Sequence, residues 1–244
     1  AFTTDGGLYV TDPARKAVYR FDPAGKLLWS YDGAAPASVG VAVSVVAAKD
    51  GSAAVLEYET GAINRLSSDG KTLKMIYNGG GTYHPATING SPDGDIYMAD
   101  TGSSRILHLD ANGQTKESIK VPAGPNGGAQ PTAVDPLPGG DLLVVDPPSS
   151  EIVRLSSKGD NSAPWGTKLR STASGPQLAS AADGSIWLNV PETGLLYRFS
   201  TDGQVKGTYI GAEALVGPRG IAVSSCCIAV SQPDAHRVDV LKLP

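Results

Sequence analysis

Short apolar stretches of three to five residues recur along the chain, and turn-forming residues separate them. In residues 91–113, SPDGDIYMADTGSSRILHLDANG, the stretches IYM and ILHL lie between an Asp-Gly pair and an Asn-Gly pair. Short runs bounded by such turn signals predict β-strands. No segment of useful length shows the 3.6-residue period of an amphipathic helix, so the pattern predicts an all-β protein.

The spacing of the turn glycines shows that this unit is repeated. The glycines of the first turn lie 45, 43, 46 and 44 residues apart; they are Gly6, Gly51, Gly94, Gly140 and Gly184. The glycines of the second turn each follow nineteen residues later; they are Gly25, Gly70, Gly113, Gly159 and Gly203. A degenerate sixth copy, IAVSSCCIAVSQ, begins at Ile221 and has Cys226 in place of the glycine. A period of roughly 40 to 50 residues with four strands per unit predicts a β-propeller.

Each copy that has both turns contains four predicted strands. A proline usually precedes the first strand, and an aromatic residue often ends the fourth, as in Tyr31, Tyr77, Trp165 and Tyr209. Because a blade packs both faces against its neighbours, its inner strands are expected to be apolar almost throughout. We therefore interpret Trp165 as part of the scaffold.

The segments DGGLYVTDPARKAVYRFDPAG and SPDGDIYMADTGSSRILHLDANG resemble the NHL repeat, in which an Asp-Gly turn, a strand ending in Asp, a polar turn and an Arg-containing strand follow one another. The resemblance is good in copies one, three and four and poor in copies two and six. Similar repeats occur in gluconolactonase-like and strictosidine-synthase-like propellers. The resemblance implies a six-bladed β-propeller of four-stranded antiparallel blades around a central channel. Such a fold is most often a scaffold for binding, and in some relatives it carries a metal-dependent hydrolase or lyase site.

We expect one propeller domain over residues 1–244. The repeats are placed at roughly 1–36, 37–82, 83–128, 129–173, 174–215 and 216–244. The last copy lacks a fourth strand, so the last blade is expected to be incomplete or to be closed by the chain ends. Of these two options, we favour the one in which residues outside this chain complete the last blade.

The composition is sufficient for a full core and gives no sign of nucleic-acid binding. Apolar residues make up 41% of the chain, the net charge is −4, and the basic residues are dispersed. A nucleic-acid-binding surface needs a basic patch. The sequence contains no run of eighteen apolar residues, so it predicts no transmembrane helix. Ala1 is not preceded by Met or a basic segment, which we interpret as a processed chain or an excised domain.

The third strands carry a cation at one common register, fourteen residues after each first-turn glycine: Arg20, Arg65, His108, Arg154 and Arg198. The second strands end in carboxylates at their own register: Asp12, Glu57, Asp100 and Asp146. We predict that these two sets form a structural ring of ion pairs between blades, because removing one partner of such a pair leaves a buried charge. Five cations could also line an anion channel.

Residues that the repeat does not require are the candidates for function. The loops before the first strands are the longest, NGGGTYHPA, VPAGPNGGAQP and YIGAEALVGPRG, and function usually lies on loops held by a rigid frame. The candidate ligand-binding residues on these loops and beside the prolines are Tyr83, His84, Gln130, Thr132, Gln177 and Arg219. A His, an Arg and several amides suit a small anionic or sugar-like ligand. The alternative is an ordinary solvated loop surface.

Metal chemistry has weaker support. The resemblance to gluconolactonase-like propellers would place a Ca²⁺ or Zn²⁺ site at Asn89 and Asp135, at equivalent ends of two first strands. That family needs a further acidic residue at a channel position, where this chain has Ser180 and Ser224. No zinc-protease, serine-hydrolase or phosphate-loop motif occurs.

Cys226 and Cys227 are the only two cysteines, and they are adjacent. Adjacent Cα atoms lie about 3.8 Å apart, whereas ordinary disulfides span about 4.4–6.8 Å, so a turn is a more credible host for a bond between them than a flat strand. A vicinal disulfide, two reduced thiols without a role, and a redox or soft-metal site remain open. A disulfide would favour an oxidising compartment.

These observations favour a non-catalytic, extracytoplasmic domain that binds a small ligand or a protein through loops at one channel mouth, with no cofactor. The alternative is a metal-dependent lactonase-like hydrolase or lyase at the same mouth. A structural assembly module is a third option, which a large apolar surface patch would indicate.

Overall fold

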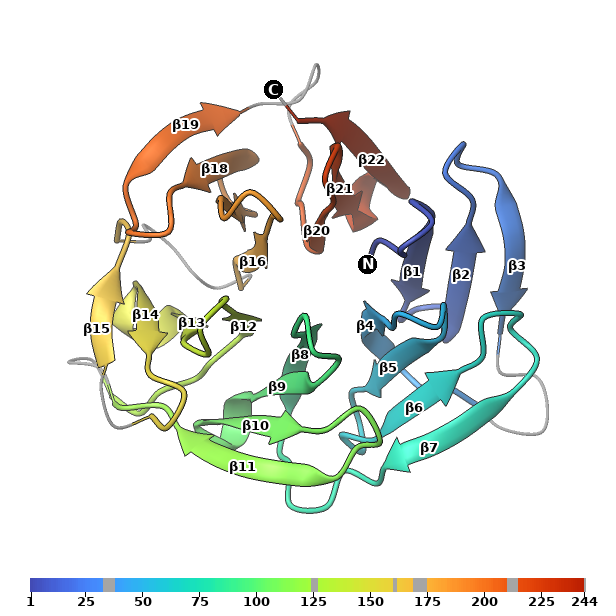
Figure 1. Cartoon of the computed structure of the whole chain (residues 1–244), viewed down its shortest axis with the longest axis horizontal. Coiled ribbons are helices and arrows are strands. Elements are labelled where there is room, and N and C mark those ends of the chain that lie inside the picture. The colour runs from blue at the N-terminus through green and yellow to red at the C-terminus, as the bar shows by residue number, and fades with distance from the viewer. Residues whose placement is uncertain (33–37, 124–126, 160–161, 169–174, 210–214, 244) are drawn as a thin grey trace. The chain divides into compact units, whose positions relative to one another are not determined.

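The computed structural model describes residues 1–32, 38–123, 127–159, 162–168, 175–209 and 215–243. The strands form six antiparallel sheets, which confirms the predicted class, a six-bladed β-propeller. The chain divides into two compact units, residues 1–120 and 121–244, and each unit holds three of the sheets (Figure 1). Each sheet lies within one of the predicted repeats.

The first unit contains one three-stranded and two four-stranded sheets, β1-β2-β3, β4-β5-β6-β7 and β8-β9-β10-β11. Their bounds are β1 Leu8–Asp12, β2 Ala17–Phe21, β3 Leu27–Tyr31, β4 Ala42–Ala47, β5 Ala53–Glu57, β6 Ile63–Leu66, β7 Leu73–Tyr77, β8 Pro85–Gly90, β9 Ile96–Asp100, β10 Arg105–Leu109 and β11 Thr115–Lys120. A 3₁₀ turn, η1 (Thr101–Ser103), joins β9 to β10. Strand β4 packs beside both β1 and β8, so the three sheets lie next to one another (Figure 1).

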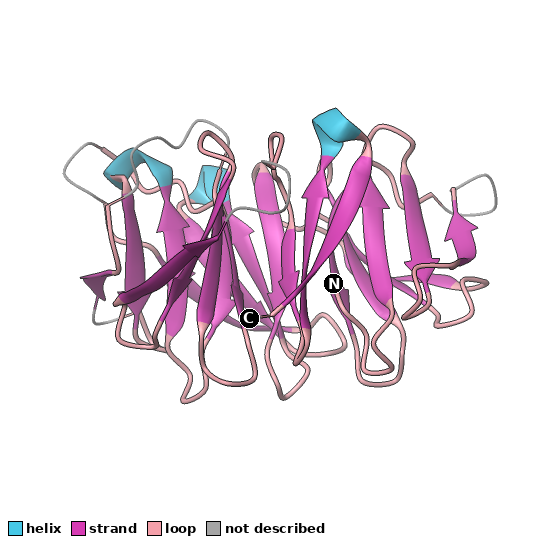
Figure 2. Cartoon of the chain, turned by 90° about the horizontal axis from the view of Figure 1, so that it is seen from above, coloured by secondary structure: helices cyan, strands magenta, loops and turns pink. Residues whose placement is uncertain are grey.

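The second unit contains two four-stranded sheets and one three-stranded sheet, β12-β13-β14-β15, β16-β17-β18-β19 and β20-β21-β22. Their bounds are β12 Ala133–Pro136, β13 Leu142–Asp146, β14 Glu151–Leu155, β15 Ser162–Trp165, β16 Gln177–Ser180, β17 Ile186–Val190, β18 Leu195–Phe199, β19 Val205–Tyr209, β20 Ile221–Val223, β21 Cys227–Gln232 and β22 Arg237–Lys242. The 3₁₀ turns η2 (Pro147–Ser149) and η3 (Pro233–Ala235) join the second and third strands of their sheets, as η1 does in the first unit; Figure 2 shows these turns in cyan at the strand ends. The last sheet has three strands, as predicted.

The repeated glycines are explained by the turns. Each first-turn glycine donates its N–H to the carbonyl three residues earlier, as Gly51 does to Ala48 and Gly184 to Ala181. Its φ is positive, +82° at Gly51 and +81° at Gly184. Glycine adopts this conformation without the steric cost that a Cβ brings.

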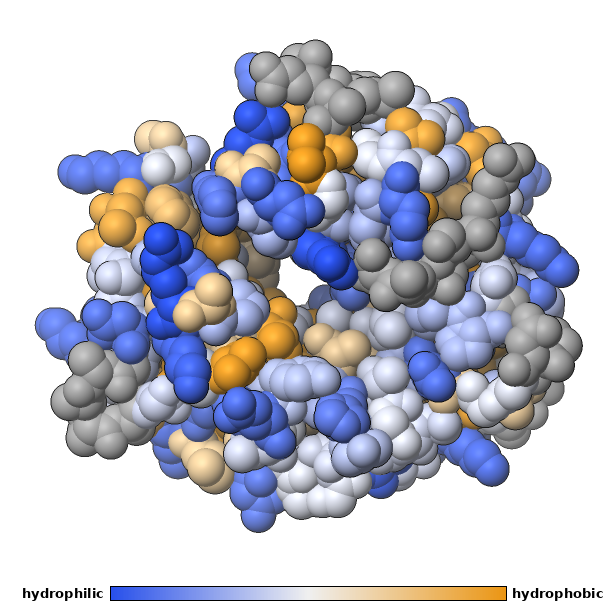
Figure 3. Space-filling model, turned by 180° about the vertical axis from the view of Figure 1, so that it is seen from behind, coloured by the Kyte–Doolittle hydropathy of each residue, from blue (hydrophilic) through white to orange (hydrophobic). Residues whose placement is uncertain are grey.

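The inner strands hold the core. All five residues of β5, β9, β13 and β17 are buried, which explains why these strands read as nearly continuous apolar runs. The outer strands β3, β7 and β19 are partly or fully exposed. On the face shown in Figure 3, apolar residues lie in separate groups among hydrophilic ones.

Aromatic side chains join neighbouring sheets within each unit. In the first unit, the Tyr9 hydroxyl donates to the Gly51 carbonyl at 2.6 Å, and Trp29 Nε1 donates to the Ser68 carbonyl at 3.1 Å. In the second unit, Trp165 Nε1 donates to the Thr201 carbonyl at 3.0 Å, and the indole packs on Phe199. Trp165 is only 6% exposed, so it is part of the scaffold, as expected.

The basic residues of the third strands, four Arg and His108, pair differently from the prediction. Four of them reach an Asp of the first turn in their own sheet: Arg20–Asp5, His108–Asp95, Arg154–Asp141 and Arg198–Asp183. Arg65 instead donates to the Ser52 hydroxyl and to the Ala111 carbonyl. The predicted pairing of these cations with Asp12, Glu57, Asp100 and Asp146 is therefore wrong for the described residues.

The strand register gives the reason. Arg20 lies opposite Tyr9, near the first turn, whereas Asp12 lies opposite Ala17 at the far end of the same hairpin. Three residues along a strand correspond to roughly 10 Å and place Asp12 on the opposite face of the sheet from Tyr9 and Arg20. The cations also use their cross-strand neighbours: Arg20 lies over the Tyr9 ring at 5.1 Å, and His108 stacks on Tyr97 at 4.3 Å.

Candidate functional site

The polar residues at the ends of the second strands hold the loop that leads into their own sheet. Their side-chain oxygens accept backbone N–H groups from that loop: Glu57 from Val41 (3.2 Å), Asp100 from Tyr83 (2.8 Å), Asp146 from Gln130 (2.7 Å) and Gln232 from Val216 (2.7 Å). All four acceptors are buried. Two of the predicted ligand-binding residues, Tyr83 and Gln130, are thus fixed through their backbones.

The carboxylate of Glu57 shows how such an anchor stays ionised. Burial raises its pKa, but the Thr60 hydroxyl and the N–H groups of Glu59, Thr60 and Val41 donate to it and hold the pKa below its usual value. A buried carboxylate that accepts several hydrogen bonds is stable as an anion. The loop after β5 is therefore pinned at the point where Tyr58 leaves the strand.

In the first unit, three exposed ring side chains meet above these anchors. The Tyr58 hydroxyl lies 3.1 Å from His84 Nδ1, and the Tyr83 and His84 rings meet edge to face at 4.2 Å. Tyr83 is 61% exposed and Tyr58 39% exposed. We call Tyr58, Tyr83 and His84 the ring cluster.

The backbone beneath the ring cluster is tightly determined. Besides its bond to Asp100, Tyr83 accepts the Gly102 N–H at 2.8 Å, and a Cβ at Gly102 would lie 2.2 Å from the Tyr83 ring. Asp100 is fully buried and also accepts Arg105 Nε at 2.7 Å. His84 has a φ of +51°, a left-handed conformation that is uncommon for a residue with a side chain.

Tyr58 was not among the residues predicted from the sequence, although the sequence carries a signal for it. The position after the last residue of the second strand is Pro13, Thr101, Pro147, Pro191 or Pro233 in the other copies and Tyr58 only here. Proline and threonine at this position begin a turn. Tyr58 also begins a turn, but it brings a large aromatic side chain to a position where the other copies have proline or threonine.

In the second unit, three other predicted residues are linked through Asn189, which is fully buried. The Asn189 side chain accepts the Gln177 N–H at 2.7 Å and donates to the Arg219 carbonyl at 3.0 Å. Gln177 Nε2 donates to the Thr132 carbonyl at 3.3 Å. Thr132, Gln177 and Arg219 therefore belong to one hydrogen-bonded row, which sequence reasoning did not connect.

Parts of two predicted loops, residues 124–126 and 210–214, lie outside the described residues. Gln130 and Arg219, at the ends of those loops, are exposed. The Arg219 backbone N–H donates to the Ser231 carbonyl at 2.9 Å, so this end of its loop is tied to β21.

The residues considered for a metal lie in different units, Asn89 on β8 and Asp135 on β12. Asn89 accepts the N–H of Gly90 at 2.8 Å, and Asp135 accepts the Ser180 hydroxyl at 3.3 Å. Asp135 is 2% exposed. Among the described residues, no group of three His, Cys, Asp or Glu side chains is placed to hold a metal ion.

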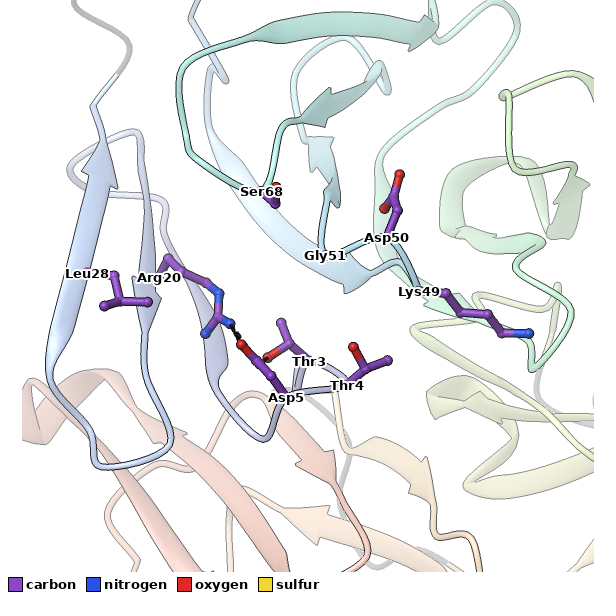
Figure 4. Close-up of a pocket in the computed structure, with 9 residues that line it drawn as sticks. All are labelled: Thr3, Thr4, Asp5, Arg20, Leu28, Lys49, Asp50, Gly51 and Ser68. Atoms are coloured by element: carbon purple, nitrogen blue, oxygen red, sulfur yellow. Dashed lines mark hydrogen bonds and ion pairs between the residues drawn. The ribbon is translucent and has the colours of Figure 1, made fainter.

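A cavity of about 340 Å³ lies beside the first two sheets of the first unit. Its lining is Thr3, Thr4, Asp5, Arg20, Leu28, Lys49, Asp50, Gly51 and Ser68 (Figure 4). Two cations and two anions line it, and the close-up shows the Arg20 guanidinium directed at Asp5. The cavity thus has no preference for one sign of charge, and no pattern in the sequence indicated it.

Cys226 ends the turn between β20 and β21, and Cys227 is the first residue of β21. Their sulfur atoms are at disulfide distance, with Cα atoms 3.7 Å apart. Cys226 is exposed and Cys227 is partly buried.

Comparison with known proteins shows the fold. No family model and no curated protein matches the sequence. Among solved structures, the chain is similar to a catalytically inactive histidine-to-alanine variant of virginiamycin B lyase from Staphylococcus aureus with quinupristin, at 17% identity and a TM-score of 0.71 over 100% of this chain and 79% of that one. It is also similar to streptogramin B lyase, at 19% identity and a TM-score of 0.70 over 100% and 81%. A chain of a nidogen/laminin complex is similar at 15% identity and a TM-score of 0.73 over 97% and 89%. The TM-scores establish a shared fold and, at these identities, nothing beyond it; the neighbours include both a lyase and a protein complex.

No helix in the described part of the chain is both long and apolar enough to cross a membrane.

Proposed function

We propose that this chain is a non-catalytic binding domain that presents its loops to a ligand or a protein partner. The ring cluster carries the proposal. Tyr83 leaves most of its surface in water, yet its backbone is fixed by a fully buried carboxylate. Exposed aromatic side chains on a rigid frame are typical of binding surfaces, because they contribute much contact area when a partner covers them.

The fixed backbone supports the same function. Ordering a loop on binding costs free energy, and a loop that is ordered beforehand avoids that cost. The Tyr83 backbone is held by Asp100, and Tyr58 directly follows Glu57, which anchors the loop before its sheet. His84 is also kept in a left-handed conformation, and such conformations tend to persist where a site needs them.

We place the domain outside the cytoplasm and, by sequence resemblance, among the NHL-type propellers. The disulfide-distance pair Cys226–Cys227 supports an oxidising compartment. The nidogen/laminin structure shows that a propeller of this fold occurs in a protein complex.

The test is a screen of the purified chain on an array of oligosaccharides and peptides. The variants are Tyr83→Ser and His84→Ser, and the control is Met75→Ser, which removes a similarly exposed apolar side chain (58%) from the outer strand β7. We expect at least one compound whose affinity falls about tenfold in the ring-cluster variants and is unchanged in the control. The free energy of unfolding of all three variants should stay within about 0.5 kcal/mol of the parent. Compounds that bind the parent and all variants equally would place the binding site elsewhere.

A lyase is the second candidate, and the contact between His84 Nδ1 and the Tyr58 hydroxyl favours it. Histidine is the side chain most often used as a general acid or base, and a hydroxyl at hydrogen-bond distance orients its ring. Two of the similar structures are lyases. The metal-dependent version would use Ca²⁺ or Zn²⁺ near Asn89 or Asp135. Mass spectrometry of each bound compound after incubation, with and without added Ca²⁺, Zn²⁺ or a chelator, decides this point, because a binding domain returns every compound unchanged.

A further inference from the structure

The turn between β20 and β21 is complete without its two sulfur atoms. The Ser224 N–H donates to the Cys227 carbonyl at 2.8 Å, and Ser224 Oγ accepts the Cys227 N–H at 3.1 Å. The Leu243 N–H donates to the Cys226 carbonyl, also at 2.8 Å. The five other copies close the equivalent turn with glycine. The pair of cysteines is therefore not needed to make the turn.

The two sulfur atoms differ in accessibility and surroundings. Cys226 is exposed, while Cys227 is partly buried at the start of β21. Lys242 on β22 lies directly opposite Cys227 in the ladder. Residues that are directly opposite share one face of an antiparallel sheet with Cβ atoms about 5 Å apart, so the Lys242 ammonium group can stabilise a thiolate on Cys227.

We propose that Cys226–Cys227 is a redox-active modification site, which a dithiol opens and which in its reduced form binds a thiophilic group through both sulfur atoms. A thiolate of the dithiol attacks the exposed Sγ of Cys226, the bond between the cysteines breaks, and Cys227 leaves as a thiolate beside Lys242. The second thiol of the reductant then attacks the mixed disulfide and releases Cys226. Two electrons and two protons pass to the cysteine pair, and the reductant becomes a cyclic disulfide.

The site is independent of the ring cluster, which lies in the first unit. Its effect on the protein is also more local than that of a structural disulfide. A bond between adjacent residues closes no long loop, so it restricts the unfolded chain very little and is expected to add little to global stability. Its effect is confined to the β20–β21 turn and to the carbonyl groups of Cys226 and Cys227.

The first experiment measures accessibility in the folded protein. The native chain is treated with iodoacetamide before and after incubation with dithiothreitol, and its intact mass is recorded. We expect no alkylation before reduction, two alkylated cysteines after it, and recovery of the original mass when the reduced protein is reoxidised. Alkylation without reductant would show that no disulfide exists. Alkylation only after unfolding would show that the bond is closed to reductants. Either result overturns the proposal.

The second experiment tests the reduced pair with phenylarsine oxide, which forms two arsenic–sulfur bonds and releases one water molecule. The reduced protein should bind one equivalent, whereas the oxidised protein and the single-thiol variant Cys226→Ser should bind none tightly. Equal binding by Cys226→Ser would contradict capture by both sulfur atoms.

A third measurement addresses the leaving group. Lys242→Gln should slow reduction by dithiothreitol about two- to fivefold, because the Cys227 thiolate loses its neighbouring charge. Lys206→Gln, which removes an exposed lysine from β19 of the same unit, is the control and should not change the rate. An unchanged rate in Lys242→Gln contradicts the role assigned to Lys242.

Discussion

At the scale of single residues, carboxylates at the same position of the repeat differ in how much they contribute to the stability of the fold. Asp100 and Asp12 both end a second strand. Asp100 is fully buried and accepts hydrogen bonds from Tyr83 and Arg105, whereas Asp12 is partly exposed and pairs with the exposed Arg15. An ion pair in water contributes little, while a buried carboxylate with two donors leaves both donors unsatisfied when it is removed.

Asp100→Ala should therefore lower the free energy of unfolding by about 2–4 kcal/mol. Asp12→Ala, the matched control at the equivalent position, should change it by less than about 1 kcal/mol. Urea denaturation followed by circular dichroism measures both. Equal losses in the two variants would contradict the view that burial of Asp100, and not its place in the repeat, sets its contribution.

At the scale of the elements, the first turns at Gly51 and Gly184 combine a glycine with an acidic side chain that caps the turn. The Ser52 hydroxyl and N–H donate to Asp50, and the Ser185 hydroxyl and N–H donate to Asp183 in the same way. These hydrogen bonds lower the pKa of Asp50 and of Asp183 below the ordinary 3.8, and the nearby Arg65 and Arg198 add to the effect. The ionised turns are thus more stable than the protonated ones.

The sign of the pH dependence follows from this direction. A carboxyl group with a lowered pKa in the folded state stabilises the protein above the unfolded pKa, and the contribution is lost as the pH falls through the folded value. Stability should therefore decrease as the pH drops below about 4. In Asp183→Asn this decrease should be shallower than in the parent, because one of the linked protons is gone. Urea midpoints at a series of pH values between neutrality and the acid range test this, and identical slopes in parent and variant would contradict it.

The sheet-to-sheet contacts of the outer strands are a second property of the elements. Trp165 is buried and donates to Thr201 of the next sheet, whereas Trp29, which donates to Ser68 of its next sheet, is partly exposed. Trp165→Phe should cost about 1–2 kcal/mol, since it removes the hydrogen bond to Thr201 and part of a buried side chain. Trp29→Phe should cost less, because water can replace the indole. Circular dichroism in urea gives both values, and a larger loss in Trp29→Phe would contradict the assignment.

At the scale of the whole molecule, the sequence predicts the number of sheets and their limits because the glycines are needed by the backbone. Gly51 and Gly184 must adopt a positive φ, so their spacing reports the geometry directly. The ion-pair partners of the basic side chains could not be predicted from the sequence in the same way. Arg20 has carboxylates at Asp5 and at Asp12, and only the register of the hairpin decides between them.

The candidate site was predicted in part for a similar reason. Tyr83 and His84 stand out beside a proline in a long glycine-rich loop, and the structure brings them together with Tyr58. Tyr58 is 25 residues away from Tyr83 (83 − 58) and belongs to another sheet, so local pattern does not connect them. The role of Asn189 was missed because a buried amide in an apolar strand looks like an ordinary variation until its two partners are visible.

Lowering the pH has two effects on the whole molecule: it first removes the net charge, and at lower pH it protonates the turn carboxylates. The formal charge is −4 at pH 7, and the isoelectric point is about 5.3, so repulsion between molecules vanishes well above the range in which the turn carboxylates become protonated. Solubility should be lowest near pH 5.3, where the circular dichroism spectrum is still native, because proteins without net charge associate readily. Asp93→Asn, which changes an exposed side chain and brings the formal charge from −4 to −3, should move this minimum to higher pH. Turbidity and circular dichroism recorded on the same samples test the separation; a solubility minimum that coincides with loss of the native spectrum would show that unfolding, and not charge neutralisation, causes the association.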